Sequence, residues 1–142
     1  MLFSQIHPLL VHFPVALFTS GVLFEIYGRL RGEKVVEVAG WFNLRLGFWF
    51  ALATATVGFL GVLSLEVKPS SKSFLNFHIL SAFSTLLVFG GAILCYRWRA
   101  RKWAWAVYHI LLIVGLTTIL TTGYLGGELV HRFGVSTLQP AD

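Results

Sequence analysis

Two histidines, His7 and His12, stand near the start of the chain in the segment IHPLLVHFPVALF, which is otherwise apolar. Three more follow at His78, His109 and His131. Neutral imidazole is the commonest metal ligand in proteins and a frequent axial ligand of haem that is not covalently attached. Ionisable side chains are costly inside a membrane, so those found there usually face a bundle interior, a cavity or a cofactor. The five histidines are therefore the first candidates for chemistry.

The chain around these histidines has the composition of a membrane protein. Of its 142 residues, 56% are hydrophobic and 12% are charged, and the charged share is about half that of a typical soluble domain. A helix needs about 20 apolar residues to cross a bilayer. Four stretches meet this need, at 8–28, 41–65, 74–97 and 103–131. We predict one all-α domain over residues 1–142, an integral membrane four-helix bundle with up-down topology.

The first stretch lacks a basic start and a small-residue cleavage site, so we expect a retained span rather than a signal peptide. Pro8 suits the first helical position, where its missing N–H would be unpaired in any case. Pro14 lies inside this predicted helix, where it should free the carbonyl of Leu10 and bend the chain. A tolerated membrane proline without a chemical role is the other interpretation.

The positively charged residues predict the orientation in the membrane. Eight of them flank the spans on one side: Arg29, Arg31, Lys34, Arg45, Arg97, Arg99, Arg101 and Lys102. Three lie on the other side: Lys68, Lys72 and Arg132. The positive-inside rule places the first set in the cytoplasm. We therefore expect a multi-pass protein of the bacterial inner membrane with both termini on the periplasmic side. Because the charges lie between spans rather than along one face, we expect no nucleic-acid partner.

The predicted orientation also gives the depth of each histidine in the membrane. His12 and His78 lie about one turn inside helices that enter from the periplasmic side, so we expect them at one level. His7 and His131 lie at the outer boundary of that side, and His109 lies alone toward the cytoplasm. Two histidines at one depth on different helices can bind a haem from both faces. We predict b-type haem with His12 and His78 as the first-choice axial pair, and His7 and His131 as a second pair or supporting groups.

Several features qualify this haem hypothesis. The chain has one cysteine, Cys95, and no CxxCH motif, so haem would be held by coordination alone. His7 and His12 are separated by five positions, about 140° around a helix, and cannot easily bind the same atom. Histidines near helix ends often contact only headgroups and water. Zinc or copper is a further alternative, but thiolates and dense carboxylates are missing on that side of the sequence.

Small residues follow one face of the second span and predict close helix packing. They are Gly47, Ala51, Thr54, Ala55, Gly58 and Gly61. On the cytoplasmic half, Glu25, Arg45 and His109 fall at similar depths. We expect an ion pair between Glu25 and Arg45, which would lower the cost of burying either charge. A quinone headgroup contact at His109 is the functional alternative to simple anchoring.

The two ends of the chain resemble the bacterial four-helix membrane family catalogued as domain of unknown function 2231, whose members open with HPxxVHFP and close with GGxLV and a GV pair. The positions that carry the resemblance are His7, Pro8, His12, Pro14, His78, Gly126, Gly127, Leu129, Val130, Gly134 and Val135. The family often has tyrosine at the position of His131 and histidine at that of Phe133, which weakens a role for His131. The resemblance implies a redox-associated membrane protein, since some members are joined to cytochrome c modules.

We predict a small electron-transfer subunit of a larger membrane redox complex, a carrier or accessory subunit more than an enzyme. Its expected partners are membrane lipids, other membrane redox subunits or a cytochrome c, and a quinone. The alternative is a haem-free accessory subunit that docks to a respiratory or photosynthetic membrane complex. A quinol-oxidising enzyme would need a quinone pocket that the sequence does not show.

Overall fold

Long apolar helices make up nearly all of the protein. The computed structural model describes residues 2–63 and 68–135, with side chains from residue 6 onward. The helices are α1 (Leu2–Leu10), α2 (His12–Arg31), α3 (Lys34–Leu63), α4 (Pro69–Tyr96) and α5 (Lys102–His131). In these described ranges there is no strand, and four helical spans are long and apolar enough to cross a membrane, with α1 and α2 joined in the span Ile6–Arg31. The predicted all-α, four-helix membrane fold is confirmed.

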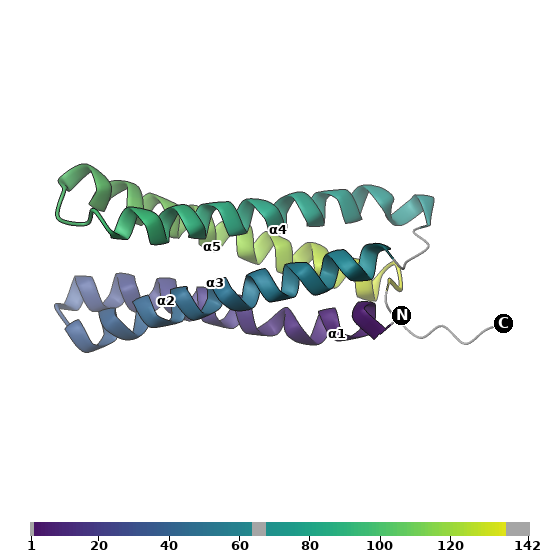
Figure 1. Ribbon diagram of the computed structural model, residues 1–142, viewed down its shortest axis with the longest axis horizontal. Helices are drawn as coiled ribbons and strands as arrows, with labels where there is room; N and C mark the ends of the chain where they lie inside the picture. Colours follow the sequence, from purple (N-terminus) through teal and green to yellow (C-terminus); the bar gives the residue numbers. More distant parts are fainter. Residues whose placement is uncertain (1, 64–67, 136–142) are drawn as a thin grey trace.

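The spans form two antiparallel helical hairpins (Figure 1). In the N-terminal hairpin α2 packs along α3, with α1 continuing α2, and in the C-terminal hairpin α4 packs along α5. Contacts within each hairpin are far more extensive than contacts between them. The start of α1 and the end of α5 lie at the same end of the bundle (Figure 1). We call this the histidine end and the opposite one, with the α2–α3 turn and the residues joining α4 to α5, the basic end.

Several helix boundaries differ from those expected from the sequence. Helix α1 begins at Leu2 and contains Pro8, so Pro8 does not occupy the first helical position. The helix is interrupted at Val11, one turn before Pro14, whose missing N–H leaves the carbonyl of Leu10 without its helical donor. Helix α4 begins at Pro69 rather than residue 74, which places a proline where its fixed backbone angle suits a helix start.

Helix α3 begins at Lys34 rather than at the expected residue 41. Gly32 adopts a left-handed conformation (φ 69°) and its N–H caps the end of α2, which lets the chain reverse within two residues. The charged segment after this turn is therefore helical, and it brings Glu37 against α2. The expected end of this helix at residue 65 lies outside the described residues.

The backbones of α2 and α3 approach so closely that glycine is required between them. A Cβ atom on Gly40 would lie 2.6 Å from the backbone nitrogen of Glu25 and 2.9 Å from the carbonyl oxygen of Gly21. A Cβ atom on Gly28 would lie 2.6 Å from the backbone nitrogen of Glu37. Small residues permit this approach in lipid, where packing replaces the hydrophobic effect as the force between helices.

Gly40→Ala is expected to lower the free energy of unfolding by about 1–3 kcal/mol, the usual cost of overpacking. The added methyl group would meet backbone atoms, which cannot move aside as a side chain tip can. Thermal unfolding in detergent measures the effect. Gly127→Ala is the matched control, because a Cβ atom there meets nothing within 4 Å. Equal stability of the two variants would contradict this account of the α2–α3 contact.

Ring pairs join the two hairpins along the bundle. Phe18 of α2 and Phe89 of α4 are fully buried and stack with ring centroids 3.8 Å apart. Toward the basic end, Trp41 stacks on Tyr96 at the same separation.

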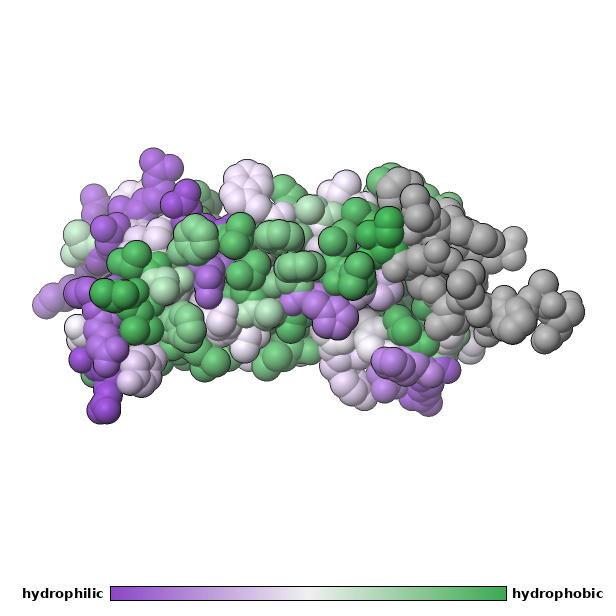
Figure 2. Space-filling model, turned by 90° about the horizontal axis from the view of Figure 1, so that it is seen from below, coloured by the Kyte–Doolittle hydropathy of each residue, from purple (hydrophilic) through white to green (hydrophobic). Residues whose placement is uncertain are grey.

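The surface matches a membrane environment. Figure 2 shows a mostly apolar middle with hydrophilic residues gathered toward the ends. Which side of the membrane each end faces stays a prediction.

Candidate functional site

Two histidine rings from different hairpins meet at the histidine end. The His7 ring of α1 and the His78 ring of α4 have centroids 6.3 Å apart, and their planes are nearly perpendicular at 85°. Both side chains are half-buried. The bundle thus brings together two imidazoles that are 71 positions apart in the chain (78 − 7), and it does so at the junction between the hairpins.

Each ring of this histidine pair is oriented by a backbone carbonyl. His7 Nδ1 lies 3.1 Å from the carbonyl oxygen of Thr54, and His78 Nδ1 lies 3.1 Å from that of Thr122. A carbonyl oxygen only accepts hydrogen bonds, so each Nδ1 carries the hydrogen and donates it. In the neutral rings each Nε2 then keeps a lone pair. This is the arrangement that metal-binding histidines use, since the bond at one nitrogen fixes the tautomer that presents the other.

Glycines on the neighbouring helices leave room for the two histidine rings. A Cβ atom on Gly58 of α3 would lie 2.6 Å from Cε1 and 2.8 Å from Nδ1 of His7. A Cβ atom on Gly126 of α5 would lie 3.2 Å from Cε1 of His78. These contacts give Gly58, a member of the small-residue face noted in the sequence, a second role beside helix packing.

Gly58→Ala is expected to displace the His7 ring and break its hydrogen bond to Thr54, because the new methyl group would overlap the ring. The imidazole N–H signal of His7 in NMR spectra of histidine-labelled protein should shift, while that of His78 should stay. Gly123→Ala serves as the control, since its Cβ atom would meet only Val15 at 3.9 Å. An unchanged His7 signal in Gly58→Ala would contradict the placement of this ring.

Hydroxyl groups fix the carbonyl that holds His78. Ser81 Oγ lies 2.7 Å from Thr122 Oγ1, Thr85 Oγ1 lies 3.3 Å from the same atom, and Thr122 Oγ1 donates to the Thr118 carbonyl. This network sets the register of α4 against α5 and so the position of the Thr122 carbonyl. This network was not among the sequence predictions. Its signal is the spacing of four between Ser81 and Thr85 and between Thr118 and Thr122, which places each pair on one helix face.

The structure does not bring His12 to His78, contrary to the expected first-choice pair. The His12 side chain is exposed, and its Nδ1 lies 3.3 Å from the carbonyl oxygen of Leu9 in its own segment. The helical rotation of about 140° between the two N-terminal histidines explains this. Because His7 faces the bundle, His12 faces outward. His131 is also exposed, at the end of α5, so neither it nor His12 joins the histidine pair.

The donor set of the histidine pair is too small for a bare metal ion. Within the part of the chain that the structure describes, no three side chains of His, Cys, Asp or Glu converge on one point. Zinc sites need three or four protein ligands, so two imidazoles leave such an ion incomplete. A haem group would bring most of its iron's ligands with it, and His7 and His78 would be the residues to hold it, each through an Nε2 that keeps its lone pair.

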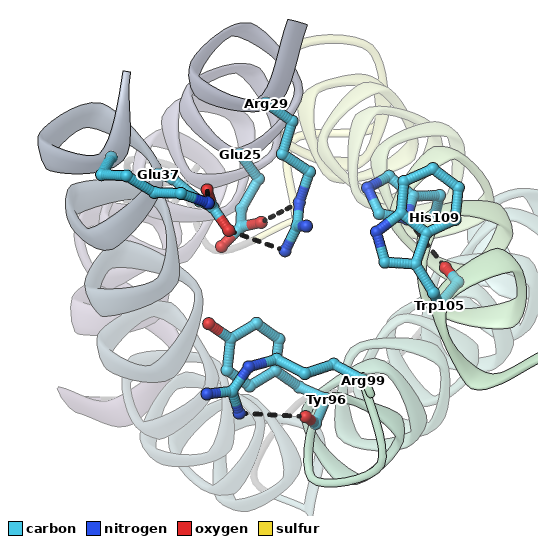
Figure 3. Close-up of polar contacts among 8 residues, drawn as sticks. Glu25, Arg29, Glu37, Tyr96, Arg99, Trp105 and His109 are labelled. Carbon is cyan, nitrogen blue, oxygen red and sulfur yellow. Dashed lines mark hydrogen bonds and ion pairs between the residues drawn. The ribbon is translucent and has the colours of Figure 1, made fainter. Parts of the chain in front are cut away.

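A second polar cluster occupies the basic end (Figure 3). Glu25 is fully buried, and its Oε2 accepts from Nε of Arg29 at 3.2 Å. Arg29 Nη2 lies 3.0 Å from Glu37 Oε1, and Lys34 Nζ lies 2.8 Å from Glu37 Oε2. We call these four residues the ion-pair cluster.

The expected ion pair between Glu25 and Arg45 is therefore wrong. Glu25 pairs with Arg29, one turn further along α2, while Arg45 is exposed on α3. His109, the other candidate on this side, bonds the carbonyl of Trp105 in its own helix through Nδ1 at 2.8 Å and packs against the Trp105 ring (Figure 3). These contacts hold the ring against its own helix, while its buried Nε2 has no hydrogen-bond partner among the described residues.

The fold and the histidine pair define the class of protein, a four-span helical membrane protein with two facing imidazoles between its hairpins. The chain belongs to DUF2231, a family of predicted membrane proteins whose model matches residues 4–139. The resemblance drawn from the chain's two ends is thereby confirmed. No curated protein and no solved structure matches the chain.

Proposed function

We propose that this protein is a small electron-transfer subunit of the bacterial inner membrane that holds b-type haem between His7 and His78. The observation that carries the proposal is the pair of neighbouring imidazoles whose Nδ1 atoms are both bonded to carbonyls, an arrangement that leaves the lone pair of each ring on Nε2. The positive-inside rule places this pair near the periplasmic face.

The separation of the rings supports a shared ligand. A metal–nitrogen bond of about 2 Å, with each ring centre about 1 Å beyond its nitrogen, puts two imidazoles on one metal about 6 Å apart. The observed centroid distance is 6.3 Å. Gly58 and Gly126 make room for the two rings, since a Cβ atom on either glycine would lie within 3.2 Å of a ring atom.

The role of the protein's own residues is to position and to insulate. Thr54 and Thr122 hold the two rings through their carbonyls, and the long apolar spans keep the site within the lipid. Bound haem would supply transfer of single electrons. Membrane lipids would surround the spans, and other membrane redox subunits, a cytochrome c or a quinone would exchange electrons with the site. In this proposal the protein is a carrier within a larger complex rather than an enzyme.

A reduced-minus-oxidised absorption spectrum of the purified protein tests the proposal. The expected result is the α-band of reduced b-type haem, with one haem per chain. Well-folded protein, produced in cells that make haem and purified in mild detergent, that shows no such band would overturn it.

A second function is supported by the same ring geometry. Edge-to-face aromatic pairs have centroids about 4.5–7 Å apart, so His7 and His78 also have the geometry of a structural contact that joins the hairpins. The protein would then be a haem-free accessory subunit that docks its aromatic outer faces to a respiratory or photosynthetic membrane complex. A double His7→Ala, His78→Ala variant that still co-purifies with its complex and supports its activity would favour this function over electron transfer.

A further inference from the structure

One arginine lies on the outer surface of a membrane span and has no protein partner. Arg45 is exposed on α3, and it forms no ion pair, hydrogen bond or ring contact with any residue that the structure describes. It lies eleven positions after Lys34, the first residue of α3, which is about 16 Å along the helix at 1.5 Å per residue. Two positions further, Gly47 lies against Phe18, near the centre of the span Ile6–Arg31. Arg45 is therefore well inside its span, where an unpaired charge is costly.

A groove beside Arg45 opens where the two hairpins meet. It has a volume of about 250 Å³ and is lined by Arg45, Phe48 and Trp49 of α3 and by Ile93 of α4. Gly90, one turn before Ile93, lets α4 approach the Phe48 ring, since a Cβ atom there would lie 3.3 Å from it. Arg45 is the only charged residue in this lining. The groove thus joins one cation to an apolar surface, which suits a ligand with an anionic head and an apolar chain.

The direction of α3 carries the Arg45 side chain toward the headgroups at the basic end. The Cα–Cβ bonds of a helix tilt toward its N-terminus, and α3 begins at the basic end (Figure 1). Arginines on lipid-facing surfaces extend along the helix to the nearer interface in this way. We therefore expect the guanidinium group to lie closer to the phosphate groups of that leaflet than the Arg45 backbone does.

The protein's own acidic residues do not supply the anion that Arg45 needs. Those that the structure describes are either buried in the ion-pair cluster or close to an end of the bundle: Glu25, Glu37, Glu33 and Glu128. A second copy in the same orientation would therefore place none of these carboxylates at the level of Arg45. Anionic phospholipids, in contrast, are attracted to clusters of positive charge at a membrane surface, and the basic end carries such a cluster.

We propose that Arg45 binds the phosphate group of an anionic phospholipid in the leaflet at the basic end, and that one acyl chain of this lipid lies in the groove of Phe48, Trp49 and Ile93. The planar guanidinium group matches the geometry of a phosphate, to which it can donate two hydrogen bonds. The site uses none of the five histidines, so it does not depend on the proposed haem.

Native mass spectrometry of the full chain tests this proposal, with equal amounts of phosphatidylglycerol and phosphatidylcholine of the same chain length added in mild detergent. The wild-type protein should retain one phosphatidylglycerol in preference to phosphatidylcholine. Arg45→Gln should lower the affinity for this lipid by about fivefold or more, the usual contribution of one arginine beside anionic lipid. The matched control is Arg101→Gln, which removes an exposed charge outside the groove and should keep the preference.

Ile93→Trp provides a second measurement, because it fills the groove and leaves every charge in place. This variant should retain less phosphatidylglycerol than the wild type. The proposal is overturned by a wild-type protein without the preference, by an Arg45→Gln variant that keeps it, or by an Ile93→Trp variant that binds as the wild type does. Displacement of the lipid by inorganic phosphate would show that the acyl chain has no part in binding and would also overturn it. If Arg45→Gln keeps the lipid and instead releases a co-purifying subunit, Arg45 pairs with protein and the proposal fails.

Discussion

Haem binding is expected to be lost completely in His7→Ala and in His78→Ala, and to be retained in His12→Ala. Each of the first two variants removes one of the paired rings, and the remaining imidazole cannot supply both axial ligands. His12 is exposed and oriented toward its own backbone, so its removal leaves the pair intact. The measurement is the haem content per folded chain, read from the α-band of the reduced protein after purification.

His131→Ala and His109→Ala extend this comparison. The first removes an exposed ring at the histidine end, and the second a ring held by Trp105 at the basic end. Both should bind haem as the wild type does. If His12→Ala loses the haem while His7→Ala keeps it, the axial pair expected from the sequence is right and the observed pair is structural. If the double variant of His7 and His78 keeps its haem, the proposed site fails.

Arg29→Met is expected to destabilise the protein by about 3–5 kcal/mol, the usual cost of removing one partner from a buried ion pair. The substitution leaves the fully buried carboxylate of Glu25 without its cation and takes one of the two cations from Glu37. Methionine keeps most of the length of the arginine stem, so the loss reports on charge more than on packing. Equilibrium unfolding in mixed micelles of mild and denaturing detergent measures the difference.

The matched control is Arg132→Met, which breaks an ion pair of the same spacing, with Glu128 at 3.5 Å. Arg132 is 64% exposed, and exposed pairs contribute about 0–1 kcal/mol. The two variants remove the same kind of ion pair, and they differ in how deeply that pair is buried. Equal losses of stability in both would contradict the view that the ion-pair cluster stabilises the basic end from within.

The spans could be predicted from the sequence because hydropathy alone decides them. Their ends could not, since these depend on contacts with other helices. The segment from Lys34 to Gly40 contains two charged residues, Lys34 and Glu37, and follows a charged turn, so it resembles a loop. It is helical because Glu37 finds Arg29 across the hairpin and Gly40 lets the two backbones touch. Hydropathy carries no information about either contact.

The position of the histidine pair could be predicted only in part. Depth along the span predicts that histidines of different spans lie near one end of the bundle, but it does not say which N-terminal histidine faces His78. His7 and His12 lie at similar heights along the bundle, but a large rotation around the helix separates them. The start of α1 sets that rotation. The contacts of the rings with the Thr54 and Thr122 carbonyls have no sequence signal, because every residue has a carbonyl. Nor does the sequence show that the glycine beside His7 contacts a ring.

The pairing of Glu25 was mispredicted for a similar reason. Similar depth suggested Arg45, whereas the spacing of four between Glu25 and Arg29 is a direct sequence signal for an ion pair on one helix face. Depth in the membrane is a weaker guide than this spacing, because many residues share one depth. The partner on α3, Glu37, lies in a charged segment whose composition predicts a loop.

The division into two hairpins has a consequence for how the protein is made. His7 belongs to the first hairpin and His78 to the second, so the ligand pair does not exist when the first hairpin leaves the ribosome. Helices that insert independently and associate afterwards would complete the pair only at association. Any cofactor held there must therefore be loaded late in biogenesis, on a chain that has already been fully synthesised through its third span.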